Sequence, residues 1–144
     1  MAFFQFKNIK VAGLACAVPV NEVKTESYKT LFGDEEVEKF MEMTGVRASR
    51  RTSTYQTCSD LGFRAAQELL EKKGVNPGEI GALIFSSHSP DYRRPSTAFV
   101  LQYRLGIPKE AICYDISLGC SSLVVGMQTV ASIMSTGDIK KALL

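Results

Sequence analysis

The sequence predicts an α/β protein in which helices cover both faces of a mixed, mostly parallel β-sheet. Two apolar runs have the length and composition of strands buried on both faces: 80–85, and 111–116, which only Asp115 interrupts. Segments with helical periodicity, 95–105 and 120–135, follow these runs. Strands that alternate with helices pair in parallel, because each connecting helix returns the chain to the same end of the sheet.

The N-terminal part of the chain is expected to add a strand, a helix and an extended arm. Residues 9–18 are rich in β-formers and small residues and end at Pro19, which predicts a first strand. Asp34 can cap a helix that ends at Gly45. Residues 47–54 are polar and extended, as in an edge strand or arm.

A further helix and a final strand complete the predicted order. Thr57, with Asp60 three residues later, resembles a capping box and opens a helix that stops at Gly74. Residues 142–144 have the composition of the opening of a buried strand. Since natural termini usually lie in surface loops, we expect residues 1–144 to be an N-terminal half-domain truncated at the start of a strand, with a C-terminal half absent.

Composition excludes several classes of function. The chain is 45% hydrophobic and 22% charged, with a formal net charge of +2 and no basic patch, which argues against a nucleic-acid partner. The N-terminus lacks the pattern of a signal peptide, so we expect a cytoplasmic protein. The uncharged stretch 116–136 contains serines, threonines and glycines, which fits a helix buried in the protein better than a membrane span.

The cysteines predict reduced thiols. Cys16, Cys58, Cys113 and Cys120 lie far apart and form no C-x-x-C pair. They and His88, the chain's one histidine, do not have the spacing of zinc ligands, so no metal is expected. Each cysteine is by default a small buried hydrophobe.

One cysteine occupies a position that suits a nucleophile. The strand 111–116 runs into a turn at Gly119 and then into a helix whose first residue is Cys120. The free amides and the dipole at a helix N-terminus stabilise a thiolate, and the same amides can donate to the oxyanion formed when it attacks a thioester. On spacing alone, packing remains the alternative to catalysis.

Five segments in the same order resemble the 3-oxoacyl-[acyl-carrier-protein] synthase III family. They are T-G-V-R-A-S-R-R, S-D-L-G-F-R-A-A-Q-E-L-L, I-G-A-L-I-F-S-S-H-S-P-D-Y-R-R-P-S-T-A, L-Q-Y-R-L-G-I and C-Y-D-I-S-L-G-C-S-S. The resemblance runs from about Val11 to the end of the chain. It implies a thiolase-like fold of two similar halves, of which this chain is the N-terminal one, with the nucleophile helix buried between layers.

The resemblance also implies an activity in fatty acid biosynthesis. In a homodimer, Cys120 would take an acyl group from an acyl-CoA or acyl-carrier-protein thioester and condense it with malonyl-acyl-carrier protein, with loss of carbon dioxide. No cofactor beyond these thioesters is implied. The family's catalytic His and Asn would lie in the absent half, so we expect the isolated chain to be inactive and His88 to be a loop or pocket-lining residue.

Three residues depart from the family pattern. Lys39 and Met43 stand where relatives that prime with acetyl-CoA commonly have a Trp and an Arg around the adenine, which favours a carrier-protein donor or an unusual CoA mode. Arg94 stands where many relatives place an apolar residue that reaches across the dimer into the acyl pocket. There it either favours a polar or anionic acyl group or points to solvent.

Other functions stay open. The nearest is another thiolase-fold enzyme, such as a hydroxymethylglutaryl-CoA synthase or a ketosynthase for a specialised lipid, polyketide or surface glycan. A noncatalytic partner domain is a further alternative. A nucleotide-binding module is disfavoured, because neither G-x-G-x-x-G nor G-x-x-x-x-G-K-[ST] occurs.

Overall fold

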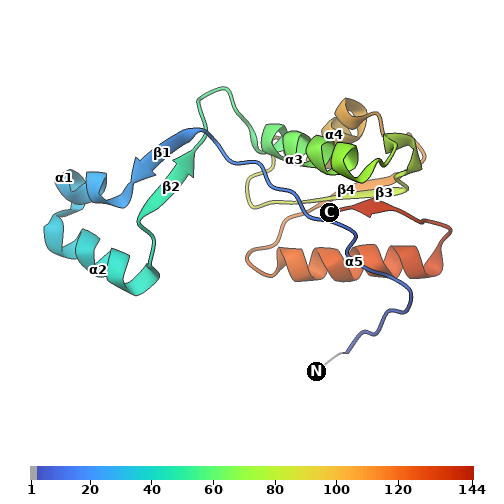
Figure 1. The fold of residues 1–144 in the computed structure, drawn as a ribbon, viewed down its shortest axis with the longest axis horizontal. Coiled ribbons are helices and arrows are strands. Elements are labelled where there is room, and N and C mark those ends of the chain that lie inside the picture. The colour runs from blue at the N-terminus through green and yellow to red at the C-terminus, as the bar shows by residue number, and fades with distance from the viewer. Residues whose placement is uncertain (1–2) are drawn as a thin grey trace. The chain divides into compact units, whose positions relative to one another are not determined.

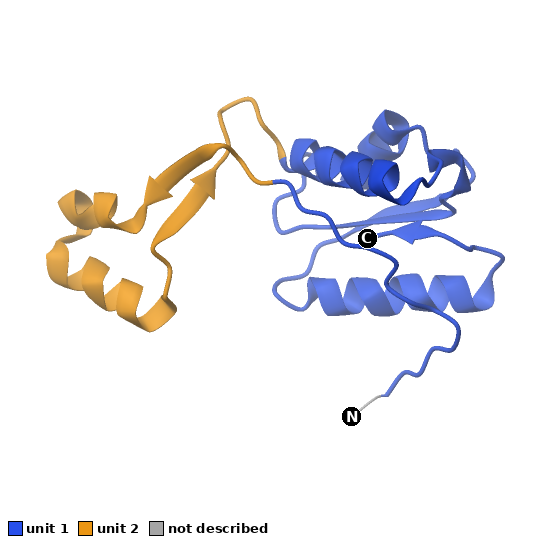
Figure 2. Cartoon of the chain, viewed as in Figure 1, with its two compact units in different colours: residues 1–17, 58–144 blue, residues 18–57 orange. Residues whose placement is uncertain are grey.

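A computed structural model describes residues 3–144, which form two compact units (Figure 2). Unit 1 joins the N-terminal segment, up to Ala17, to Cys58–Leu144, and unit 2 is Val18–Thr57. Each unit has its own sheet and its own buried residues. The two are therefore described separately.

Unit 1 is built on a three-stranded parallel sheet in the order β4-β3-β5. The strands are β3 (Ala82–Ser86), β4 (Ile112–Ile116) and β5 (Ala142–Leu143). In the register of the first pair, Ala82 lies beside Ile112 and Ser86 beside Ile116. The three-layer α/β arrangement and the strands at 80–85 and 111–116 agree with the sequence prediction.

Helices cover both faces of this sheet. α3 (Cys58–Lys73) and α4 (Thr97–Leu105) lie on one face and α5 (Ser122–Thr136) on the other (Figure 1). A short 3-10 helix, η2 (Pro77–Glu79), leads into β3. The buried core lies between the sheet and the α3–α4 layer and consists of Leu70, Ile80, Leu83, Ala98, Leu101, Leu105, Ile107, Cys113 and Leu143.

Glycines end the helices where the sequence predicted it. Gly74 follows α3 with φ 61°, and Gly106 follows α4 with φ 72°, a left-handed conformation that costs a residue with a β-carbon about 1 kcal/mol or more. α5 carries the uncharged stretch noted in the sequence. Among residues 3–144, no helix has both the length and the apolar character needed to cross a membrane.

Unit 2 consists of a small antiparallel ribbon and short helices. β1 (Asn21–Lys24) pairs with β2 (Ala48–Arg51), and η1 (Thr25–Tyr28), α1 (Lys29–Phe32) and α2 (Asp34–Thr44) lie between them in the chain. α2 buries Val37 and Met41 and ends at Gly45, where φ is 71°. The Thr25 hydroxyl donates to the Val46 carbonyl at 3.0 Å, which ties the helical segment to the ribbon.

The predicted strand 9–18 is wrong for this structure. Residues 9–17 have no assigned secondary structure; the side chains of residues 12–17 alternate between exposed and half-buried, but the segment pairs with no strand among the described residues. Gly13 lies instead against the Lys73 and Leu69 side chains of α3. An extended segment becomes a strand only when a neighbour supplies its hydrogen bonds, and sequence pattern alone does not reveal that neighbour.

Candidate functional site

Cys120 lies in the turn between β4 and α5, at the carboxyl end of the parallel sheet. The Ser122 amide donates to the Gly119 carbonyl at 2.9 Å and closes this turn. Ser121 is the N-cap residue, so Cys120 precedes the first helical residue by two positions rather than opening the helix as predicted. The thiol is exposed and stands beside the N-terminal amides of a 15-residue helix.

The loop that follows β3 reaches the same turn. A β-carbon placed on Gly119 would lie 3.3 Å from Nε2 and 3.6 Å from Cε1 of His88, so the imidazole packs directly on this glycine. Ser87 fixes the backbone on both sides of His88. Its amide donates to the Ile116 carbonyl at 3.2 Å, and its Oγ accepts from the Ser89 amide at 3.0 Å.

A buried hydroxyl lies at the same edge of the sheet. Oγ of Ser86, the last residue of β3, is buried and has no hydrogen-bond partner among residues 3–144. Buried polar groups in proteins are nearly always satisfied, so this hydroxyl departs from the usual pattern. The carboxyl edge of β3 and β4 therefore carries an exposed thiol, an imidazole and an unsatisfied hydroxyl.

Two aspartates cap the helices of the opposite layer. Asp115 of β4 accepts hydrogen bonds from the amides of Thr97 and Ala98, at 2.7 and 2.8 Å, at the start of α4. Asp91 accepts from the Ser59 amide of α3 at 3.0 Å, and its own amide donates to Thr97 Oγ1 at 3.2 Å. The β3–α4 loop, residues 87–96, is thus tied to both helices.

The other three cysteines are less suited to nucleophilic chemistry. Cys113 is buried in β4, and this burial raises the pKa of its thiol. A hydrogen bond from the Leu83 backbone lowers the pKa, but by less. Cys58 opens α3, but the Asp91 carboxylate already occupies that helix N-terminus. Cys16 is exposed in the extended N-terminal segment, away from any helix start. At Cys120 exposure and a helix N-terminus coincide, and the Ser121 side chain makes no capping bond in the described structure.

The remaining predicted site residues lie on the surface of their units. Arg94 is exposed near the end of the β3–α4 loop, before Pro95. Lys39 and Met43 are exposed on α2 of unit 2. Their roles at the donor entrance and at the acyl pocket stay predictions. In the part of the chain that the structure describes, no group of three or more His, Cys, Asp or Glu side chains could hold a metal ion.

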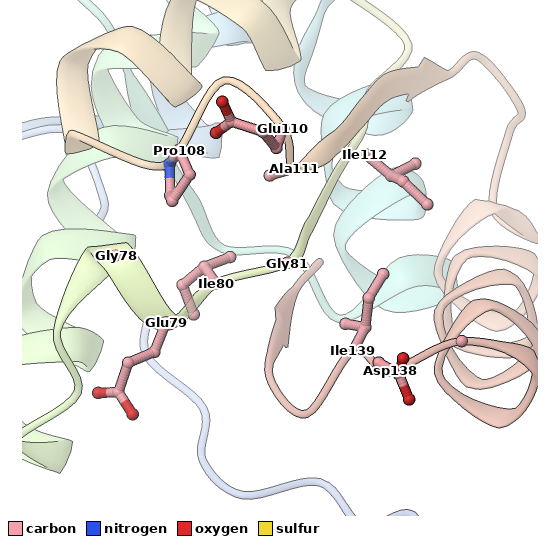
Figure 3. A pocket seen from close by; sticks show the side chains of 11 residues that line it. Gly78, Glu79, Ile80, Gly81, Pro108, Glu110, Ala111, Ile112, Asp138 and Ile139 are labelled. Carbon is pink, nitrogen blue, oxygen red and sulfur yellow. The ribbon is translucent and has the colours of Figure 1, made fainter.

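A cavity of about 430 Å³ lies at the other end of the sheet (Figure 3). Its lining comes from the segments just before β3, β4 and β5, including Ile80, Ala111 and Ile139. Cys120 follows the carboxyl end of β4, so this cavity is separate from the thiol. Glu79, on its lining, is already paired with Lys141, and we assign the cavity no part in the chemistry.

Sequence reasoning singled out Cys120 as the candidate nucleophile but missed the contacts around its turn. His88 packs on Gly119, and Asp91 and Asp115 cap helices. Each of these contacts links residues 17 to 32 positions apart, which only the folded sheet brings together. One signal was present. Asp115 is the single charged residue in an otherwise apolar strand, and a buried strand carries a charge only when that charge has partners.

Comparison with known proteins shows one consistent similarity. The chain is 34% identical, over 95% of its length, to the beta-ketoacyl-[acyl-carrier-protein] synthase III of Clostridium beijerinckii, and it covers 42% of that protein. It is 32% identical, over 94% of its length, to the protein of the same name from Alkalilimnicola ehrlichii, and again covers 42%. The chain thus spans about two fifths of the length of the curated relatives it matches. No family model matches the chain.

Solved structures show the same similarity. A 3-oxoacyl-(acyl-carrier protein) synthase from Burkholderia xenovorans superimposes with a TM-score of 0.88 and 34% identity, over 92% of this chain and 38% of the other. OleA from Xanthomonas campestris gives a TM-score of 0.84 and 26% identity, over 96% and 42%. These matches confirm the thiolase-like α/β fold and the resemblance inferred from the five sequence segments.

Proposed function

We propose that this chain, a relative of beta-ketoacyl-[acyl-carrier-protein] synthase III along 95% of its length, is the nucleophile-bearing part of an acyltransferase of that type. One observation carries the proposal. Cys120 is an exposed thiol at the carboxyl end of a parallel strand, directly ahead of a long helix. Among the four cysteines, it combines access to a substrate with amides that can stabilise negative charge.

The proposed reaction begins with acylation of Cys120. The thiolate attacks the carbonyl carbon of an acyl thioester, and the amides at the start of α5 donate to the resulting oxyanion. The donor thiol leaves, and the acyl-enzyme then condenses with malonyl-acyl-carrier protein, with loss of carbon dioxide. In the family that the sequence resembles, this second step needs a His and an Asn from the other half of the enzyme. We therefore propose that the isolated chain does not condense substrates.

We assign the recognition of the donor to residues outside the turn. Lys39 and Met43, both exposed, would line the donor entrance and favour an acyl-carrier-protein thioester over stacking of the CoA adenine. Arg94 would border the acyl pocket and favour a polar or anionic acyl group. We further propose a cytoplasmic homodimer that binds acyl-carrier protein.

The experiment that tests the function is acylation followed by site mapping. The protein is incubated with isotopically labelled acyl-CoA and, separately, with labelled acyl-acyl-carrier protein, and peptide masses locate the label. We expect label on Cys120, its loss in Cys120→Ser, and its retention in Cys16→Ser, which removes another exposed thiol. Label on a different residue, or equal labelling of Cys120→Ser, refutes the assignment.

A second candidate function is favoured by the similarity to OleA. The chain would then belong to another thiolase-fold enzyme, such as a ketosynthase for a specialised lipid, that does not use malonyl-acyl-carrier protein. The two candidates are separated by supplying malonyl-acyl-carrier protein to the complete enzyme after acylation. Formation of a β-ketoacyl product supports the first candidate. An acyl-enzyme that leaves the malonyl-acyl-carrier protein unconsumed supports the second.

A further inference from the structure

We propose that Arg93 and Arg94, in the β3–α4 loop, bind an anionic group of the donor thioester, a carboxylate or a phosphate, and draw it toward the turn that carries Cys120. The inference rests on the proposed role of Cys120 as the nucleophile. It deepens the assignment of Arg94 in two ways. It adds a second arginine, and it names the chemical group that the loop recognises.

Both ends of the β3–α4 loop are bonded to the segment that leads to Cys120. At the start of the loop, the Ser87 amide donates to the Ile116 carbonyl at 3.2 Å. Where the loop enters α4, the Thr97 amide donates to the Asp115 carboxylate at 2.7 Å. Residues 115 and 116 end β4, and the turn that follows them carries the thiol. The loop therefore leaves from and returns to the carboxyl edge of the sheet at which Cys120 lies.

The loop is held in place just before the two arginines. The Asp91 carboxylate accepts from the Ser59 amide at 3.0 Å, and the Asp91 amide donates to Thr97 Oγ1 at 3.2 Å. Both anchors are buried, with 2% exposure for Ser59 and 0% for Thr97. Because the folded chain already orders this loop, a ligand that binds Arg93 and Arg94 does not have to order it, and preorganisation of this kind strengthens binding.

The two guanidinium groups are unpaired. Arg93 and Arg94 are both exposed, and neither forms an ion pair or a hydrogen bond with another of the residues 3–144. Arg104 shows the contrast, because its guanidinium lies 2.8 Å from the Asp60 carboxylate and over the Phe63 ring. The arginines of the loop thus keep all their donors for a ligand.

The charge at this edge favours an anion. Residues 87–96 contain two arginines and one aspartate, a formal charge of +1, and that aspartate already caps α3. The N-terminus of α5 adds a positive partial charge beside Cys120. A guanidinium presents its donors in a planar fork that matches a carboxylate or a phosphate. A donor thioester can carry the first at the far end of its acyl group and the second in its CoA or phosphopantetheine part.

The test compares two alkylating reagents of nearly equal shape. Iodoacetate carries a carboxylate and iodoacetamide does not, and both react with the thiolate, so the ratio of their rates at one cysteine is independent of its pKa. Peptide masses give this ratio at Cys120 and at Cys16, the exposed thiol of the N-terminal segment. In Arg93→Gln/Arg94→Gln, at about 0.01 M salt, we expect the ratio to fall about tenfold at Cys120 and to hold at Cys16.

Two further variants separate local charge from other causes. Lys109→Gln removes an exposed cation at the opposite end of β4 and should leave the ratio at Cys120 as in the wild type. Arg93→Lys/Arg94→Lys keeps both charges and should keep most of the ratio. An unchanged ratio in Arg93→Gln/Arg94→Gln overturns the proposal. So does an equal fall in Lys109→Gln, because the effect would then belong to the net charge of the protein.

Labelled thioesters then identify the anion. Wild type and Arg93→Gln/Arg94→Gln receive butanoyl-CoA, 3-carboxypropanoyl-N-acetylcysteamine or butanoyl-N-acetylcysteamine, which carry a phosphate, a carboxylate and neither. A fall in acylation confined to the first donor identifies the phosphate, and a fall confined to the second identifies the carboxylate. The same change with all three overturns the proposal. Absence of label on Cys120 with every donor refutes the proposed function, while the alkylation ratios still decide whether the loop attracts anions.

Discussion

Replacing Asp115 by alanine tests how the sheet holds the α3–α4 layer. This carboxylate receives two short hydrogen bonds, from the amides of Thr97 and Ala98 at 2.7 and 2.8 Å. Both donor residues are completely buried, with 0% exposure. Asp115→Ala would therefore leave two amides at the start of α4 without an acceptor, in a place where the fold gives water little access.

The expected loss follows from these contacts. A buried donor without a partner costs about 1–3 kcal/mol, whereas removal of an N-cap acceptor as a whole costs about 0.5–2 kcal/mol. With two buried amides affected, we expect Asp115→Ala to lower the free energy of unfolding by about 3 kcal/mol. Asp115→Asn keeps one acceptor oxygen and should lose about half as much.

Urea denaturation measures the effect. With a slope of about 2 kcal/mol per molar, the midpoint should fall by about 1.5 M for Asp115→Ala and by about 0.7 M for Asp115→Asn. Asp138→Ala, an exposed aspartate in the loop between α5 and β5, is the matched control and should shift the midpoint by less than about 0.25 M. A midpoint for Asp115→Ala within the range of this control would show that the two hydrogen bonds do not stabilise the fold.

Two further changes test packing and electrostatics. Gly62→Ala in α3 would place its methyl 3.4 Å from the Phe85 ring, which is an ordinary contact. Because alanine has a higher helix propensity than glycine, the change should stabilise the protein by about 0.5–1 kcal/mol in the same urea assay. A loss of stability would show that the site is too tight for a methyl group. The hydrogen bond from Lys141, and then that from the Asn76 amide, lower the pKa of Glu79 below its ordinary value of 4.5. A carboxylate whose pKa is lower in the folded than in the unfolded protein contributes stability above its unfolded pKa, and this contribution is lost as pH falls through its folded pKa. Glu79→Gln should therefore flatten the dependence of stability on pH below about 4.5. An acid profile identical to that of the wild type would contradict this.

Sequence reasoning succeeded where structure is local. The helices that end at Gly45, Gly74 and Gly106 were predicted, because a left-handed stop is encoded in one residue. Strands β3 and β4 were predicted, because each lies in an apolar run, which in β4 is interrupted only by Asp115. β1 was missed, since its sequence, Asn-Glu-Val-Lys, has little strand character and becomes a strand only through pairing with β2.

The same distinction holds for the candidate site. The place of Cys120 between a buried strand and a helix could be predicted, but the start of α5 could not, because the Ser122–Gly119 hydrogen bond tightens the turn and moves the helix two residues on. The contact between His88 and Gly119 depends on the register of two strands. A one-residue change in that register would separate them, and no local pattern specifies it.

The ties of Asp91 and Thr97 also restrict how the β3–α4 loop can vary. Asp91 holds the first turn of α3, while Thr97 holds the Asp91 amide, so an insertion or deletion between them would release a helix that lies outside the loop. Change of length is therefore costly here, but change of side chain is not. Arg93 and Arg94 are exposed within this fixed frame, so other side chains can replace them without refolding the scaffold.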